Sequence, residues 1–218
     1  MIAAEARSCT HIDEFVARAG RGLRPEAPGL LEPQSNPKGD HELELDGAPV
    51  TLVRVPKPAA VLVPVVLREG ETMVLFTQRA PGLRHHSGQI AFPGGKIDAG
   101  ETALDTALRE AQEEIGLEPT LVEPLGYLDA YLSSSNYLVM PVVGLVTPVF
   151  QLAPNPEEVA EVFEVPLGFL MDSDNHELHA REWKGRIRQY YAIPYGERYI
   201  WGVTAGILRN MYERLYGP

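Results

Sequence analysis

The stretch that decides the fold reads Gly95-Lys-Ile-Asp-Ala-Gly-Glu101-Thr-Ala-Leu-Asp-Thr-Ala-Leu-Arg109-Glu110-Ala-Gln-Glu113-Glu114-Ile-Gly116-Leu117. Its apolar residues recur with the period of an α-helix, which predicts a helix over 102–115. One face of that helix is expected to be buried, through Leu104, Leu108, Ala111 and Ile115. Gly116 suits the position just after the helix end, where a left-handed backbone is common.

Three carboxylates fall together on another face of this helix: Glu110, Glu113 and Glu114. Like charges four residues apart destabilise a helix by ~0.2–0.5 kcal/mol, and the dipole disfavours anions near the helix C-terminus. A bound Mg²⁺ or Mn²⁺ relieves this repulsion, because hard divalent cations bind carboxylate oxygens. Glu110 and Glu114, one turn apart, are expected to share one metal ion. The alternative is a solvated Glu/Arg surface, but the full spacing occurs by chance on the order of once in a million chains of average composition.

The rest of the chain predicts one α/β domain with a mixed sheet. Strands are expected at 60–63 and 72–76, joined by a hairpin at Gly70-Glu71, and around 125–132, 138–146 and 162–165. Residues 80–100 are expected to form a loop, in which Pro93-Gly94-Gly95 turns tightly and presents backbone groups to a ligand. A short helix at 11–18 and an irregular connection make residues 1–45 an N-terminal extension, and 46–218 the main domain, which ends with a helix at about 204–215.

The charge and composition of the chain limit which classes of molecule it can bind. The chain has 218 residues and a formal net charge of −11, which disfavours binding to long polyanions such as DNA or RNA. A small anionic ligand is still compatible with this net negative charge, because a bound divalent cation inverts the local charge. The sequence has no apolar run of membrane-spanning length and no signal-peptide pattern, so a cytoplasmic protein without a membrane partner is expected. The single cysteine, Cys9, excludes an internal disulfide.

The quoted stretch resembles the Nudix box at all of its defining positions. The resemblance implies an α/β/α sandwich with a loop–helix–loop catalytic motif that hydrolyses a nucleoside diphosphate linked to another group. It also implies roles for individual residues. Glu110 and Glu114 are the implied metal ligands, with Glu113 as a further ligand or a water-orienting group. Arg109 and Glu101 are the implied ion pair that holds the motif together.

The segment just upstream indicates a branch of that family. Residues 75–95 read LFTQRAPGLRHHSGQIAFPGG and resemble the signature of the coenzyme A diphosphatases. Thr77, Arg79, Arg84, Gly88 and Phe92 to Gly95 match, whereas Phe76 and Ala80 stand in place of Leu and Ser. The resemblance implies coenzyme A or a derivative as substrate, with 4′-phosphopantetheine and adenosine 3′,5′-bisphosphate as products. The expected substrate-binding residues are Arg79, Arg84, Gly94, Gly95 and Lys96. His85 and His86 add to this basic group but fit a loop surface equally well.

Several alternatives stay open at this point. The general base could be Glu113 or, from a distant loop, Glu158. The substrate could be another nucleoside diphosphate derivative, such as ADP-ribose or a dinucleotide. A non-catalytic nucleotide-sensing protein of the same fold is a further alternative, although such proteins usually lose the carboxylates that this chain keeps. A homodimer is compatible with the sequence. Four tyrosines could stack on an adenine, but core packing or a dimer interface is the preferred interpretation: Tyr190, Tyr191, Tyr195 and Tyr199.

Overall fold

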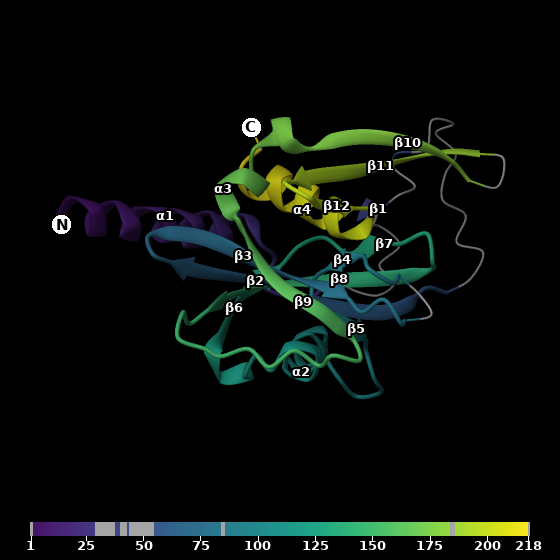
Figure 1. Cartoon of the computed structure of the whole chain (residues 1–218), viewed down its shortest axis with the longest axis horizontal. Helices are drawn as coiled ribbons and strands as arrows, with labels where there is room; N and C mark the ends of the chain where they lie inside the picture. The colour runs from purple at the N-terminus through teal and green to yellow at the C-terminus, as the bar shows by residue number, and fades with distance from the viewer. Residues whose placement is uncertain are drawn as a thin grey trace.

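A computed structural model of the chain describes residues 2–28, 38–39, 43, 55–83, 86–183 and 186–217, with no side chains described for 2–11, 183 and 186. A nine-stranded mixed sheet forms the middle layer. Helix α2 (Ala103–Ile115) covers one face, and α1 (Ile2–Gly22), α4 (Val203–Leu215) and a three-stranded sheet cover the other (Figure 1). The expected α/β sandwich with a mixed sheet is confirmed.

The strand β2 (Lys57–Arg68) lies at the centre of the large sheet. It pairs in parallel with β8 (Tyr137–Val146) and in antiparallel fashion with β3 (Glu71–Arg79), which follows after a tight turn at Glu69-Gly70. The predicted hairpin is therefore confirmed. β9 (Val159–Pro166) pairs with the outer side of β3. The shorter strands of this sheet are β1 (Lys38–Gly39), β4 (Ile90–Ala91), β5 (Gly94–Lys96), β6 (Val122–Tyr127) and β7 (Tyr131–Leu132).

β2 runs straight through Pro64, although proline is rare inside a central strand because it lacks an N–H group. On one side of β2 the antiparallel partner changes, from β5 opposite 59–61 to β3 opposite 65–68. Pro64 lies at this change of partner, and the N–H of Leu62, two residues earlier on the same side, donates to Pro93 O at 2.9 Å. The proline thus occupies a position where no ladder hydrogen bond is required.

Helix α2 is closed at both ends as the sequence predicts. Thr102 and Asp105 form a reciprocal capping box, and Gly116 adopts a left-handed conformation (φ 71°) at the C-terminus. The predicted buried face, however, is partly wrong. Leu104 and Leu108 are only half-buried, and the fully buried positions include Ala103, Ala107, Ala111, Glu114 and Ile115. The small alanines let the helix approach β2 and β5 closely. The helix is thus rotated about its axis relative to the predicted orientation, and this rotation places the Glu114 carboxylate in the interior.

The opposite face of the sheet is covered by elements from both ends of the chain. α1 is longer than the helix expected at 11–18, and Phe15, Ala19 and Leu23 join the core beside α4. Asp129 accepts hydrogen bonds from Arg24, at the end of α1, and from Arg214 of α4, so one carboxylate connects the two helices. The predicted division at 45/46 lies outside the described residues.

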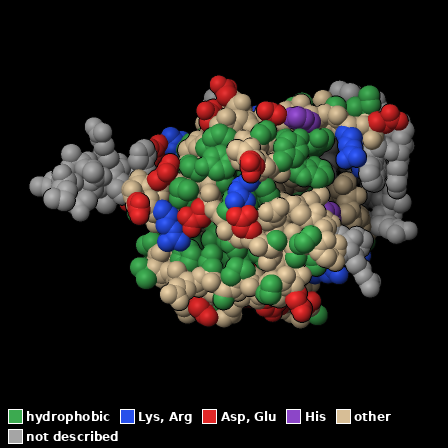
Figure 2. All heavy atoms as spheres, in the orientation of Figure 1, with side chains coloured by type: hydrophobic (Ala, Val, Ile, Leu, Met, Phe, Trp, Pro, Cys, Tyr) green, Lys and Arg blue, Asp and Glu red, His purple; other side chains and the backbone are tan. Residues whose placement is uncertain are grey.

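Two further segments complete this face. A three-stranded antiparallel sheet consists of β10 (Glu177–Trp183), β11 (Arg186–Tyr195) and β12 (Arg198–Trp201), none of which the sequence predicted as a strand. Short helical turns are α3 (Leu167–Leu170), η2 (Pro119–Leu121) and η3 (Ser173–Asn175). Among the described helices, none is long and apolar enough to span a bilayer. In Figure 2 the blue and red side chains on the visible face are mixed, so the net negative charge is distributed among basic groups there.

Candidate active site

Arg109 binds three carboxylates at the exposed side of α2. Its guanidinium meets Glu101 at 2.7 Å, Glu110 at 3.0 Å and Glu113 at 3.1 Å. Thr106 Oγ1 also donates to Glu101, at 2.7 Å. Hydrogen bonds from Arg109 and Thr106 lower the pKa of Glu101 to about 2. These contacts join the start of the motif to the helix, and they occupy the carboxylate of the otherwise exposed Glu113.

Glu110 is packed directly against the backbone of β5. A Cβ atom placed on Gly95 would overlap the Glu110 carboxylate, and one placed on Gly94 would overlap the carbonyl of Ala60. The two glycines are therefore required for close approach, not for the tight turn that we expected, since Gly94 and Gly95 form a strand paired with β2. Burial raises the pKa of Glu110, while its hydrogen bond with Arg109 opposes that shift.

Glu114 is the most buried carboxylate of the motif, with a relative exposure of only 4%. Burial raises its pKa to about 8; Arg79 opposes the shift, and the negative charges of Glu110 and Glu158 add to it. The nearest cation is Arg79, whose Nη1 lies 3.9 Å from Glu114 Oε1. In addition, Arg79 Nε is buried and has no hydrogen-bond partner among the described residues. A buried carboxylate and an unsatisfied guanidinium thus face the same space.

Glu158 reaches this space from the loop between β8 and β9. The loop is fixed on the end of α2, because the N–H groups of Ala153 and Asn155 donate to the carbonyls of Ile115 and Glu114, each at 2.9 Å. The carbonyl of Glu158 in turn accepts from Ala80, the residue after Arg79, at 2.8 Å. Segments that are distant in the sequence are thereby joined, and the structure brings Glu158 near Glu110 and Glu114.

The residues present fit a divalent cation. Among the described residues, no group of three or more His, Cys, Asp or Glu side chains forms a complete metal cage. Mg²⁺ does not need such a cage, since it commonly uses one or two protein carboxylates and takes the remaining oxygens from water and phosphate. Glu110 and Glu114 supply two hard oxygen donors, both largely withdrawn from water, and a cation would offset the cost of their burial.

The other expected site residues divide into three groups. Gly94 and Gly95 lie beside the carboxylates as described. Lys96 has an exposed side chain, and its carbonyl accepts a long hydrogen bond of 3.4 Å from Arg109. Arg84, together with His85, lies outside the described residues.

Sequence reasoning missed two features that shape this site. The sequence grouped Glu114 with Glu110 and Glu113 on one face of the helix and did not indicate that Glu114 lies in the interior; its spacing of three from Ala111 and seven from Ala107 was the available signal. The second feature is an irregular register between β3 and β9 at Gln78 and Arg79, which no sequence pattern announced. Such a bulge re-aims the neighbouring side chain, here Arg79.

Comparison with known proteins agrees with this geometry. Residues 56–186, more than half of the chain, match the NUDIX domain. The chain belongs to the Nudix family. Among relatives of this Nudix protein, the Uncharacterized Nudix hydrolase NudL of Photorhabdus laumondii is 38% identical over 175 residues, which is 80% of this chain and 93% of that protein. A protein of the same name from Yersinia pestis is 41% identical over 158 residues, covering 72% and 79% of the two chains.

Solved structures with a similar fold have lower sequence identity to this chain. A binary complex of an Ap4A hydrolase from C. elegans is 19% identical, with a TM-score of 0.45 and coverage of 50% and 80%. The NUDIX domain of Shewanella oneidensis NrtR in complex with ADP ribose is 20% identical, with a TM-score of 0.42 and coverage of 57% and 81%. We assign neither of those ligands to this Nudix chain from such distant likeness. The family assignment makes the chain a hydrolase of a nucleoside diphosphate derivative, and Nudix hydrolases generally use divalent metal ions.

Proposed function

We propose that this Nudix hydrolase cleaves the diphosphate bond of coenzyme A or its derivatives, giving 4′-phosphopantetheine and adenosine 3′,5′-bisphosphate. The observation that carries the proposal is the position of Arg79. It belongs to the upstream segment that resembles the coenzyme A diphosphatase signature, and its guanidinium lies 3.9 Å from the buried Glu114. With Nε unsatisfied, Arg79 can donate to a phosphate oxygen at the point where the metal ligands converge.

Glu110 and Glu114 would hold Mg²⁺ or Mn²⁺, and Glu113 is the further ligand implied by the family pattern. When bound, such a cation neutralises charge on the diphosphate oxygens and makes water a better nucleophile. The chain's own part is to position these groups. Gly95 brings the backbone against Glu110, and the capping interactions fix the helix that carries both carboxylates. Arg79 orients the diphosphate and offsets its negative charge in a low-dielectric site.

Glu158 is the better supported of the two candidate bases. The Glu113 carboxylate is already engaged by Arg109 at 3.1 Å. Glu158 is exposed, lies on a loop fixed beside Arg79 and is near enough to raise the pKa of both Glu110 and Glu114. It is therefore free to accept a proton from attacking water.

The test is hydrolysis of coenzyme A with Mg²⁺, with the products identified by mass. Both expected products should form with wild type, stop forming in excess chelator and return when Mg²⁺ is restored. Glu114→Gln should lose most of kcat, whereas Glu123→Gln, an exposed substitution on β6, should not. Turnover that persists in chelator, or full activity of Glu114→Gln at saturating substrate and metal, would overturn the metal mechanism. Cleavage of another nucleoside diphosphate derivative with coenzyme A left intact would overturn the substrate.

A further inference from the structure

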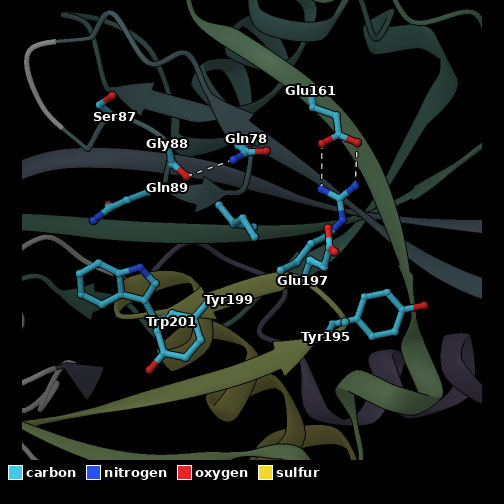
Figure 3. Close-up of a pocket in the computed structure, with 12 residues that line it drawn as sticks. Gln78, Ser87, Gly88, Gln89, Glu161, Tyr195, Glu197, Tyr199 and Trp201 are labelled. Atoms are coloured by element: carbon cyan, nitrogen blue, oxygen red, sulfur yellow. Dashed lines mark hydrogen bonds and ion pairs between the residues drawn. The ribbon is translucent and has the colours of Figure 1, made fainter.

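A cavity opens between the large sheet, at β3 and β9, and the hairpin of the three-stranded sheet. It has a volume of about 850 Å³, and its walls come from Gln78, the segment 87–90, Glu161 and the hairpin 195–201. In Figure 3 these walls face one another across an open centre, with Trp201 and Tyr199 opposite Gln89 and Gly88. Gln78, which lines the cavity, directly precedes Arg79 at the end of β3. The cavity therefore begins one residue, or roughly 3.3 Å of strand, from the phosphate-binding arginine.

An aromatic wall lines this cavity and continues beyond it. Tyr199 and Trp201 share one face of β12, while Ile200 between them is fully buried in the core. Tyr190 of β11 meets Trp201 edge-on at 5.6 Å, and His179 of β10 contacts both Tyr190 and Tyr199. Tyr199 nevertheless remains 40% exposed. Core packing, one part of the preferred interpretation of these tyrosines, is thus wrong for Tyr199 and fits Tyr191, which packs against the core; the other part, a dimer interface, stays a prediction.

The charges around the cavity disfavour a phosphate as its occupant. Arg198 is the one cation among the described lining residues, and its guanidinium is held by Glu161 at 2.7 and 3.0 Å. The same guanidinium lies 3.7 Å from the centre of the Phe163 ring. Glu197 adds a further negative charge. The lining that remains consists of rings and carboxamides, which suit a neutral planar group bearing hydrogen-bond donors and acceptors.

We propose that the cavity between β12 and the 87–90 segment binds the adenine base of the substrate, stacked on Trp201 or Tyr199. The inference rests on the proposed function for its ligand. With the diphosphate at Arg79, where β3 ends, one arm of the substrate is left to extend past the end of that strand towards the cavity. It divides recognition between two sites of opposite character. Arg79 and the metal ligands bind the charged centre, and an uncharged aromatic cavity selects the base.

The experiment uses Trp201 as its own reporter. A Trp183→Phe protein keeps Trp201 as its single tryptophan, because the chain has two. The protein is titrated with adenosine and separately with pantetheine, neither of which carries the diphosphate, and Trp201 fluorescence is recorded. Saturable quenching by adenosine alone is expected. Tyr199→Leu in the same background should weaken adenosine binding by about fivefold to a hundredfold, the range of base–aromatic stacking. Tyr216→Leu, placed against Arg18 at the end of α4, serves as the matched control and should not.

Three outcomes would overturn the inference: quenching by pantetheine in preference to adenosine, no saturable quenching by either probe, or equal weakening by the Tyr199 and Tyr216 substitutions. None of these measurements requires turnover. Failure of coenzyme A hydrolysis with adenosine still bound in the cavity would therefore reject the proposed substrate and leave the base site standing. Hydrolysis of coenzyme A without adenosine binding would reject the base site and leave the proposed substrate standing.

Discussion

Glu114→Gln should stabilise the metal-free protein at alkaline pH and have little effect in acid. The carboxyl has an ordinary pKa of 4.5, and burial raises it to about 8 in the folded chain. Because the folded state holds its proton more tightly, the favourable contribution is complete below pH 4.5 and is lost as the pH rises to about 8. Above that pH the folded protein carries an ionised, buried Glu114 that the unfolded chain would solvate freely.

The size of this effect follows from the pKa interval. At 1.36 kcal/mol per pH unit, the rise to about 8 corresponds to at most ~5 kcal/mol in the free energy of unfolding. Local relaxation and water entry reduce such values, so we expect about 2 kcal/mol. In a domain of this size, that is an increase in Tm of roughly 4–8 °C for the glutamine variant.

The assay is urea unfolding of wild type and Glu114→Gln in excess chelator, at pH 5 and at pH 8.5. Glu123→Gln is the control, because Glu123 is exposed on β6. The midpoint of Glu114→Gln should exceed that of wild type at pH 8.5 and approach it at pH 5, while the control follows wild type throughout. A glutamine variant that is no more stable than wild type at pH 8.5 would refute the reasoning that Glu114 is a frustrated buried carboxylate.

Four other substitutions test the helix–strand approach, substrate binding and the contact between α1 and α4. Gly95→Ala should lower kcat/KM at least tenfold by displacing Glu110, whereas Gly82→Ala, where a new Cβ meets nothing within 4 Å, should leave it unchanged; equal effects would argue against the close approach. Arg79→Ala should lose the same factor with coenzyme A and with dephospho-coenzyme A, because Arg79 is proposed to orient the diphosphate that both substrates carry. By the sequence resemblance, Arg84→Ala should cost more with coenzyme A, by about tenfold to a hundredfold for one charge-assisted contact with the 3′-phosphate. A larger loss on coenzyme A for Arg79→Ala, or the same loss on both substrates for Arg84→Ala, would contradict these assignments. Burial raises the pKa of Asp129, but the hydrogen bonds from Asn210 and Arg214 outweigh burial and hold that pKa below its ordinary value. Asp129→Asn should therefore cost ~1–3 kcal/mol at pH 7 and less as the pH falls below 4, and a cost that is independent of pH would contradict this.

The sequence predicted the elements whose signal is local. The capped helix at 103–115, the hairpin at Glu69-Gly70 and the final helix at 203–215 all follow from periodicity and from glycine positions. The rotation of α2 was not predictable in this way. Leu104 and Leu108 outrank alanine in hydrophobicity, but tertiary contact with β2 and β5 selected the smaller side chains for the interior.

The sequence indicated which residues belong to the candidate site better than it indicated how they lie relative to one another. The spacing of Glu101, Arg109 and Glu110 implied their proximity, because one helix and one turn carry all three. The approach of Arg79 and Glu158 to Glu114 depends on strand order and on a loop fixed by backbone hydrogen bonds. The β10–β12 sheet was not predicted because its strands mix charged, polar and apolar residues, as in Glu177–Trp183 (ELHAREW), without a long apolar run. The aromatic cavity was not predicted either, because this sheet forms one of its walls.

The central claim is that this Nudix hydrolase acts on coenzyme A. The most direct test is a competition in which equal concentrations of coenzyme A and ADP-ribose are incubated with the enzyme and Mg²⁺, and all products are followed by mass. The account predicts that 4′-phosphopantetheine and adenosine 3′,5′-bisphosphate accumulate first. Consumption of ADP-ribose while coenzyme A stays intact would contradict it.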